Sequence, residues 1–174
     1  MNMKILGAFA AVALLAACAN TPKTNTAAAG SGATAATSGP APGSEQDLVA
    51  SVGDRVFYAF DRSGLSSEAQ TTLDRQAAWL QKYPQVQVMI AGNCDARGTE
   101  EYNLALGQRR ANTARDFLVA RGVAPTRVQT ISYGKDRPVA LGSDSQAFAQ
   151  NRNAITSVQG QNPQAGAGQT SMTN

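Results

Sequence analysis

Two oppositely charged side chains mark the part of the sequence that could do chemistry. Asp95 lies in the stretch Asn-Cys-Asp-Ala-Arg-Gly-Thr (93–99), which reads as the end of a strand followed by a turn. Arg110 comes about four helical turns later, on the helix that the next residues predict. A carboxylate and a guanidinium held on separate rigid elements suit a zwitterion, a ligand whose ammonium and carboxylate lie close together. The pair therefore predicts a binding site and does not point to catalysis.

The absence of histidine excludes several kinds of catalytic and metal site. The chain contains no histidine, so it has no Ser-His-Asp triad and lacks the ligand of most zinc sites. Cys94 has no imidazole to activate it as a nucleophile. We expect Cys94 to be a small apolar side chain at a strand end, and we predict no metal and no cofactor.

The residues around the pair predict an alternation of strands and helices that would position it. Runs rich in β-branched and aromatic residues predict strands at 55–60, 86–91, 128–133 and 151–158. Apolar residues at helical spacing predict one helix after the first strand and one after the second. Two βα units followed by two strands, in the order βαβαββ, indicate an α/β fold: a two-layer sandwich with a small mixed sheet and helices on one face.

Capping residues and apolar stripes define the two helices. Ser67 and Gln70 fit a capping box at the start of the first helix, and Pro84 stops it. The second helix is predicted from about 100 to 121, with Gly122 as the left-handed residue that ends it. The residues predicted to face the core are Ala69, Leu73, Ala77 and Leu80 in the first helix and Leu104, Ala111, Ala114 and Leu118 in the second.

The first residues read as a targeting segment. A positive start and an apolar run of about eleven residues at 5–15 are typical of a signal peptide and too short to span a membrane. Leu15-Ala16-Ala17-Cys18 looks like a bacterial lipobox, whose cysteine is lipidated and becomes the first residue of the mature protein. We predict a signal peptide at 1–17 and lipidation of Cys18; an ordinary signal peptide with an incidental cysteine is the alternative. Ala19, where an aspartate would argue for the inner membrane, favours the outer membrane.

Composition divides the rest of the chain into a leash, one domain and a tail. Residues 18–44 are mostly Ala, Thr, Gly, Ser and Pro and predict a flexible leash, and the polar segment 159–174 predicts a frayed tail. Residues 45–158 are long enough for one domain. The net charge is +3, but Lys4 and Lys23 lie outside the domain, which leaves 13 Lys and Arg against 12 Asp and Glu within it. Since no basic stripe emerges, we expect no nucleic-acid binding.

A series of short motifs runs through the predicted domain. From the second strand into the second helix these are Gly92–Thr99, Tyr102–Asn103, Leu106–Gly107 and Arg109–Ala111. Further motifs on either side are Phe60–Asp61, Ser132–Lys135, Pro138 and Asn151–Arg152. In order and spacing this series resembles the OmpA-like (outer-membrane-protein-A-like) peptidoglycan-binding domains, and with the lipobox and leash the whole chain resembles the lipoproteins of that family.

The resemblance implies a ligand and a set of site residues. In that family an aspartate and an arginine bind meso-diaminopimelate in the peptide stem of the cell wall, and by position these are Asp95 and Arg110. Positions near the ligand groove in relatives correspond to Asp61, Arg97, Thr99 and Asn103. Local roles remain open: Asp61 as a turn cap, Thr99 as the helix N-cap, Asn103 as a brace of the loop, and a surface ion pair between Asp95 and Arg110.

Two residues depart from the family pattern. Many relatives have a histidine where Asn93 stands, and many have a second arginine where Asn153 stands. Asparagine keeps a neutral hydrogen-bonding role but does not titrate near neutral pH. One positive charge is therefore missing near the last strand, with consequences for affinity or for the choice of wall peptide.

The function implied by the resemblance is structural. It is that of a lipoprotein that joins the outer membrane to peptidoglycan from the periplasmic side, with TolB as a partner and with roles in envelope integrity and cell division. An envelope lipoprotein of this fold that does not work with TolB is one alternative. Flagellar stator subunits share the fold but need a spanning helix, which the sequence does not predict.

A wall-cleaving enzyme that uses carboxylates is the alternative from another class, with Asp95, Glu100 or Glu101 as acid and base. Glu100 and Glu101 are adjacent at a helix start and point about 100° apart, so no partner is placed to work with Asp95. For the binding pair we expect exposed side chains. Replacing Asp95 or Arg110 by alanine is then predicted to abolish wall binding with little effect on the thermal melt.

Overall fold

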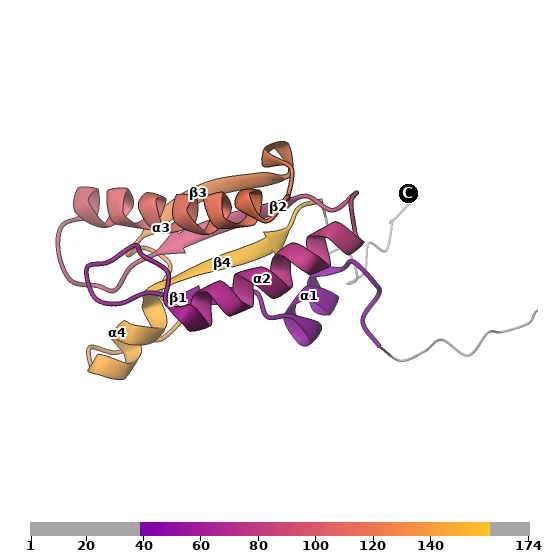
Figure 1. Cartoon of the computed structure of the whole chain (residues 1–174). Coiled ribbons are helices and arrows are strands. Elements are labelled where there is room, and N and C mark those ends of the chain that lie inside the picture. Colours follow the sequence, from indigo (N-terminus) through magenta and orange to yellow (C-terminus); the bar gives the residue numbers. More distant parts are fainter. Residues whose placement is uncertain (1–38, 161–174) are drawn as a thin grey trace, which may run out of the picture. The chain divides into compact units, whose positions relative to one another are not determined.

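A four-stranded mixed sheet with two long helices against one face makes up the described part of the chain, residues 39–160, in the computed structural model (Figure 1). The strands are β1 (Arg55–Phe57), β2 (Val88–Asn93), β3 (Val128–Gly134) and β4 (Asn153–Val158). Their order in the sheet is β1-β4-β2-β3. β2 and β3 run parallel, while β4 is antiparallel to both of its neighbours.

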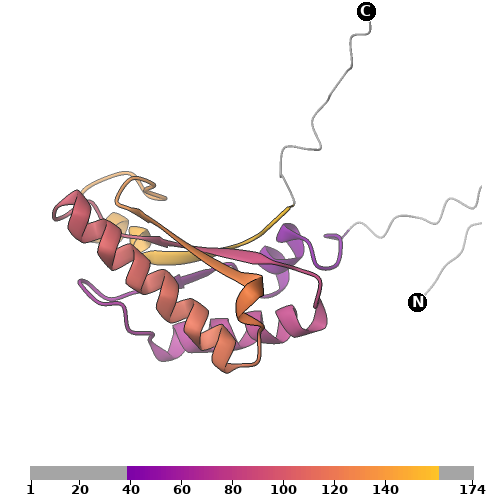
Figure 2. The same cartoon turned by 90° about the horizontal axis from the view of Figure 1, so that it is seen from above.

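The helices complete the α/β fold that the sequence predicts. The two long helices are α2 (Ser67–Lys82) and α3 (Glu100–Ala120), which lie on the same side of the sheet in Figure 2. Shorter elements are α1 (Glu45–Ser51), the 3₁₀ turn η1 (Pro125–Arg127) and α4 (Ser145–Asn151). The prediction of a two-layer sandwich with a small mixed sheet is confirmed.

Alternate residues of the central strands form the core with the two long helices. Val88 and Ile90 of β2 are completely buried, as are Leu73 and Leu80 of α2. Ala111, Ala114 and Leu118 close this layer from α3. Each large apolar side chain removed from water stabilises the fold by about 1.5–3 kcal/mol. The packing of the sheet against the two helices is therefore a main source of stability.

Two glycines bring α3 unusually close to β2. A Cβ atom on Gly92 would lie 1.9 Å from the carbonyl oxygen of Gly107, and one on Gly107 would lie 2.3 Å from Ser132 Oγ. No side chain fits at either position. The part of α3 around Gly107, with Arg110 about one turn later, is thereby set directly against the end of β2.

Several predicted boundaries and one predicted stripe differ from the structure. The N-cap of α2 is Ser66, whose hydroxyl accepts from the backbone N–H of Ala69 at 3.2 Å, so the prediction of Ser67 as the cap is wrong. The first strand ends at Phe57, earlier than predicted. Leu104 is 37% exposed and Leu106 is buried in its place, whereas Ala111, Ala114 and Leu118 of the same predicted stripe are buried as expected.

The helix α1 was not predicted, and it joins the two ends of the described chain. Ser44 caps α1, and Trp79 Nε1 donates to Asp47 Oδ2 at 3.0 Å. The backbone N–H of Val158 donates to Glu45 Oε2 at 2.5 Å. The start of α1 and the end of β4 therefore lie beside each other, at the end of the sheet where β2 begins.

The predictions for the chain ends fall outside the described residues. These are the signal peptide, lipidated Cys18, the leash up to residue 38 and the tail from residue 161. Within residues 39–160, no helix has the length and apolar character needed to cross a membrane.

Candidate functional site

A pocket of about 220 Å³ opens where β2 ends, α3 begins and β4 begins. Five of the six predicted ligand residues line it: Asp61, Asp95, Arg97, Asn103 and Arg110. Thr99 does not line the pocket; its hydroxyl accepts from the backbone N–H of Tyr102 and caps α3. Six lining residues were not among the predicted ligand contacts: Phe60, Cys94, Gly98, Tyr102, Leu106 and Arg152.

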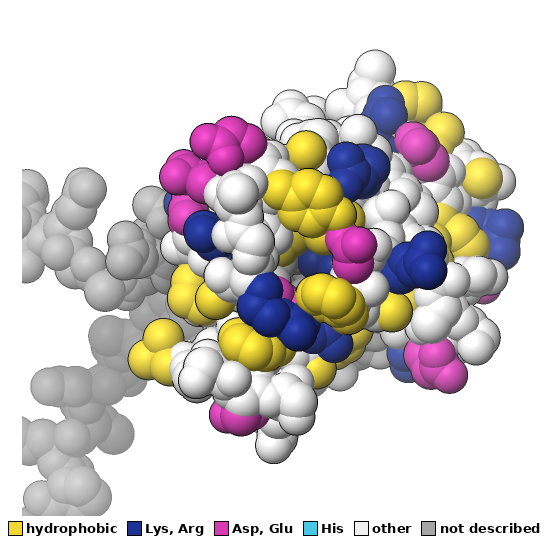
Figure 3. Space-filling view, turned by 90° about the vertical axis from the view of Figure 1, so that its left-hand side faces the viewer, with side chains coloured by type: hydrophobic (Ala, Val, Ile, Leu, Met, Phe, Trp, Pro, Cys, Tyr) yellow, Lys and Arg dark blue, Asp and Glu magenta, His cyan; other side chains and the backbone are white. Residues whose placement is uncertain are grey.

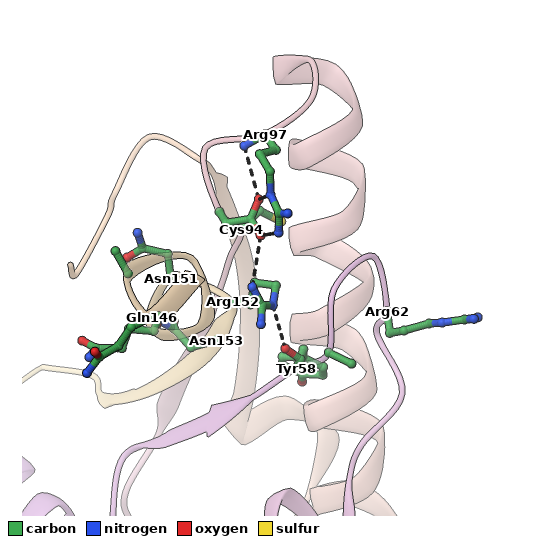
Figure 4. A network of polar contacts seen from close by, with 12 residues as sticks. Tyr58, Arg62, Cys94, Arg97, Gln146, Asn151, Arg152 and Asn153 are labelled. Carbon is green, nitrogen blue, oxygen red and sulfur yellow. Dashed lines mark hydrogen bonds and ion pairs between the residues drawn. The ribbon is translucent and has the colours of Figure 1, made fainter. Parts of the chain in front are cut away.

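Asp95 holds two arginines at once. Its Oδ1 accepts from the backbone N–H and from Nε of Arg97, both at 3.2 Å. Its Oδ2 accepts from Arg97 Nη2 at 2.6 Å and from Arg152 Nη1 at 3.3 Å. Figure 4 shows Arg97 and Arg152 on opposite sides of this network. Burial raises the pKa of Asp95, but the hydrogen bonds from the two arginines outweigh burial and hold that pKa below its ordinary value.

Arg110 is buried and bonded mainly to backbone carbonyls. Its Nε donates to Arg62 O at 2.9 Å, Nη1 to Asn93 O at 2.8 Å and Nη2 to Ala59 O at 3.2 Å. A further contact runs from Nη1 to Cys94 Sγ at 3.3 Å. Burial lowers the pKa of Arg110, although a guanidinium stays charged at all ordinary pH values. These contacts use four of its five N–H groups and tie together the end of β2, the segment after β1 and α3.

The predicted exposure of the pair is wrong. Asp95 is only 4% exposed and Arg110 is fully buried, because the carboxylate is covered by arginines and the guanidinium inserts beneath the backbone of the β1–α2 connection. No hydrogen bond or salt bridge joins Asp95 to Arg110 in the described contacts. Both groups nevertheless line the same pocket, so they bring a negative and a positive charge to one opening.

Arg152 is the main site residue that sequence reasoning missed. It lies between α4 and β4, and its Nε donates to Tyr58 O at 3.0 Å while its Nη1 bonds Asp95 (Figure 4). The Asn151–Arg152 motif contained the signal, but only the antiparallel pairing of β4 with β2 brings this residue to Asp95.

Aromatic side chains surround the exposed part of Arg97. Its guanidinium carbon lies 4.0 Å from the centroid of the Phe60 ring and 4.6 Å from that of Phe148. Figure 3 shows basic side chains interleaved with hydrophobic ones on this side of the domain. Cation–π contacts of this kind contribute about 0.5–1 kcal/mol at exposed sites, so the two rings help to hold Arg97 in place.

The opposite rim of the pocket contains a second acid. Tyr102 donates its hydroxyl to Asp61 in a short hydrogen bond, and this contact raises the pKa of Tyr102. Among the non-glycine residues of the described chain, Asp61 alone has a positive φ, of 56°. Such a conformation is uncommon outside Gly, Asn and Asp, and Asp61 lines the pocket in it.

Asn103 and Cys94 support the pocket from beneath. Asn103 Nδ2 donates to Arg97 O at 2.8 Å and to Thr99 O at 3.0 Å, which braces the loop as the local alternative predicted. Cys94 is buried, and burial raises the pKa of its thiol. The thiol is therefore held in its neutral form, which suits a packing role. No group of three potential metal-binding side chains occurs within residues 39–160.

The two residues that depart from the family pattern contact each other. Asn93 Nδ2 donates to Asn153 Oδ1 at 2.8 Å, and Asn153 Nδ2 donates to Gln150 O at 2.6 Å. Asn93 is 3% exposed and Asn153 is fully buried. The two positions thus form one neutral pair that joins the ends of β2 and β4 directly behind the pocket.

Known proteins resemble this chain in sequence and in structure. The sequence pattern of the OmpA family matches residues 57–152. A peptidoglycan-associated lipoprotein of Mesorhizobium japonicum is 49% identical over 158 residues, which are 90% of this chain and 92% of the relative. A protein of the same name from Rhizobium meliloti is 52% identical over 149 residues, 84% of this chain and 82% of the relative.

Solved structures show the same fold. The peptidoglycan-associated lipoprotein of Burkholderia pseudomallei has a TM-score of 0.59 at 42% identity, over 61% of this chain and 90% of that one. The C-terminal domain of MotB from Helicobacter pylori has a TM-score of 0.56 at 21% identity, over 59% of this chain and 81% of that one. The second likeness shows the fold alone.

Proposed function

Because this chain belongs to the OmpA family, among its peptidoglycan-associated lipoproteins, we propose that its pocket binds the peptide stem of peptidoglycan without cleaving it. The ligand group is meso-diaminopimelate, whose free amino-acid centre presents an ammonium beside a carboxylate. Asp95 accepts from the ammonium, and the positive charge of Arg110 faces the carboxylate. Asp61, Arg97 and Asn103 line the rest of the opening.

The observation that supports this proposal is the meeting of Asp95 and Arg110 at one pocket. They come from different elements, the end of β2 and the middle of α3, and each is fixed by several hydrogen bonds. Fixed charges bind a rigid zwitterion without first having to be ordered. Charge-assisted hydrogen bonds of this kind contribute about 1.5–3 kcal/mol each, which suits a reversible attachment.

The wider role follows from the same family membership. With Cys18 lipidated and the leash joined to the domain, the protein would tether the outer membrane to the cell wall from the periplasm. We place it in the Tol–Pal system, with TolB as its partner, in envelope integrity and in constriction of the outer membrane at division. Co-purification of TolB with the chain tests this part; its absence under conditions of native expression favours an envelope lipoprotein that works without TolB.

Sedimentation with isolated sacculi tests wall binding. Asp95→Asn keeps the shape of the side chain and removes its charge, and it should abolish most of the sedimentation. Asp116→Asn is the matched control, since Asp116 is an exposed acid on α3 (side chain 69% exposed) away from the pocket. Retained sedimentation of Asp95→Asn would remove the assignment. Steady release of soluble muropeptides by the wild-type domain would favour the wall-cleaving alternative.

Cell fractionation tests the lipid anchor. Replacing Cys18 by alanine should move the protein from membrane pellets into the soluble periplasmic fraction, because two or more acyl chains are needed for stable anchoring. A variant that remains in the membrane pellet contradicts lipidation at this residue.

A further inference from the structure

We propose that the guanidinium of Arg97 takes the place of the ligand's cationic group in the free protein. It is hydrogen-bonded to the Asp95 carboxylate there and must leave before the ligand's ammonium can bind. This inference rests on the proposed function, because it concerns the same carboxylate. It assigns Arg97 a role as a competitor of the ligand and not as one of its contacts.

Asp95 has no free acceptor site in the free protein. An ionised carboxylate offers about four lone-pair positions. Four donors occupy them: three from Arg97, including its backbone N–H, and one from Arg152. Since Asp95 is only 4% exposed, an incoming ammonium can reach either oxygen only after a donor has left.

Of the two arginines that bond Asp95, Arg97 is the one able to leave. Arg152 is anchored by its bond to Tyr58 O, and its side chain is 15% exposed. The side chain of Arg97 is 44% exposed, and its guanidinium has Asp95 as its hydrogen-bond acceptor in the described contacts. Its other described contacts are the faces of Phe60 and Phe148, which contribute only a weak cation–π attraction at an exposed site and leave the side chain partly open to solvent. Rotation of one exposed side chain therefore opens the carboxylate.

The charge of the pocket also favours an exchange of one cation for another. The lining residues include three arginines (Arg97, Arg110 and Arg152) and two acids (Asp61 and Asp95), a balance of +1. An ammonium added to this set would be repelled by three nearby cations. Exchanging the guanidinium of Arg97 for the ammonium keeps the number of cations at Asp95 unchanged, and Arg152 stays bonded to Asp95 meanwhile, which avoids a buried, unpaired carboxylate.

The affinity for the ligand is therefore set by how much more strongly Asp95 binds the ligand's ammonium than the guanidinium of Arg97. The ligand gains a bond to Asp95 only as Arg97 loses one. Removing the guanidinium of Arg97 should therefore tighten binding, the opposite of what happens when a residue that contacts the ligand is removed.

Calorimetric titration with a synthetic stem tripeptide that ends in meso-diaminopimelate tests the proposal. Arg97→Gln should bind the peptide about tenfold more tightly than wild type, which corresponds to about 1.4 kcal/mol. Arg97→Lys retains a cation that still pairs with Asp95, so its affinity should stay between those of wild type and Arg97→Gln. Arg75→Ala is a matched control that removes an exposed arginine from α2 and should bind like wild type. Weaker binding by Arg97→Gln overturns the proposal.

A second measurement separates this proposal from the proposed function. In the wild-type protein, the NMR signal of the Arg97 Nε–H should lose its protection from solvent exchange when the peptide saturates the site; an unchanged signal in the complex overturns the exchange. The pKa of Asp95, followed through its carboxyl carbon without any ligand, should rise in Arg97→Gln. If neither the wild type nor any variant binds the peptide, the proposed function fails. Separately, an Asp95 pKa that is unchanged in Arg97→Gln would show that Arg97 does not pair with this carboxylate in the free protein.

Discussion

At the scale of single residues, Arg110 shows how a site residue can also be a structural one. Its guanidinium donates to three carbonyl oxygens from two separate segments. The backbone carbonyl of Arg110 in turn accepts from the hydroxyl of Tyr58 at 2.8 Å. A loss of wall binding after its removal would therefore carry two meanings, a lost ligand contact or a disturbed fold. Asp95, at the pocket opening, gives the cleaner test.

Replacing Arg110 by alanine should cost stability as well as binding. The change leaves buried carbonyl oxygens without donors and opens a cavity beneath the β1–α2 connection, so we expect a loss of about 3 kcal/mol or more in the free energy of unfolding. Urea denaturation measures it, with Arg109→Ala, an exposed neighbour, as the control. A loss below about 1 kcal/mol would show that the buried contacts of Arg110 contribute little.

The Asn93–Asn153 pair predicts a measurable coupling. Each single change to alanine removes the 2.8 Å hydrogen bond from the buried side chain of the partner, at a cost of about 1–3 kcal/mol. The double variant removes both partners and should lose less than the sum of the two single losses. A double-mutant cycle by urea denaturation gives the coupling; strictly additive losses would mean that the 2.8 Å contact does not contribute to stability.

At the scale of the elements, the position of α3 depends on the contact between Gly92 and Gly107. An alanine at Gly107 would place its Cβ 2.3 Å from Ser132 Oγ and 2.8 Å from Gly92 O, so α3 must move away from β2. We expect a loss of about 2–3 kcal/mol in stability together with weaker sacculus sedimentation, because Arg110 lies one turn further along the same helix. Gly64→Ala is the control, since nothing lies near a Cβ at that position. A Gly107→Ala variant with wild-type stability and binding would contradict the close packing.

The sequence predicted the long elements well because their signals are local. The stripe of Ala69, Leu73, Ala77 and Leu80 is buried as expected, and Thr99 caps α3. α1 was missed because a seven-residue helix with one buried residue, Leu48, carries almost no periodic signal. Hydrogen bonds with two residues distant in the sequence, Trp79 and Val158, hold α1 in place.

The candidate site could be predicted only in part for the same reason. Asp95 and Arg110 stand in motifs whose spacing is visible in the sequence, and both line the pocket. Their burial depends on Arg152 and on the carbonyl groups of the β1–α2 connection. These partners come together only when β1 and β4 pair, which no local pattern reveals.

At the scale of the whole molecule, stability should fall in acid. Hydrogen bonds lower the pKa of Asp47, mainly from Gly43 N–H, and of Asp144, mainly from Ala147 N–H. The pKa of Asp95 is lowered as well, despite burial. A carboxyl whose folded pKa is depressed stabilises the fold above its unfolded pKa of about 3.9, and that contribution disappears as the pH falls through the folded pKa.

Thermal melts between neutral and acid pH measure this dependence. The melting temperature should change little above about pH 5 and decrease steadily below about pH 4. Glu45 acts in the opposite direction, because burial raises its pKa and its protonation in acid therefore favours the folded state. It should make the fall in melting temperature less steep at the upper end of the acid range. Asp95→Asn should show a shallower acid decrease than wild type. Equal slopes for the two proteins would mean that Asp95 does not contribute to acid sensitivity.

The pocket and the ends of the described chain lie at opposite ends of the sheet, which has a mechanical consequence. The start of α1 and the end of β4 lie beside the start of β2, whereas the pocket lies where β2 ends and β4 begins. In the proposed function, tension on a tether joined at the N-terminal side would therefore be applied to the pole opposite the pocket. A domain fastened at both poles would align with the line of pull and carry the load lengthwise along its central strands, so that stretching of the envelope would orient the attachment without peeling it from one side.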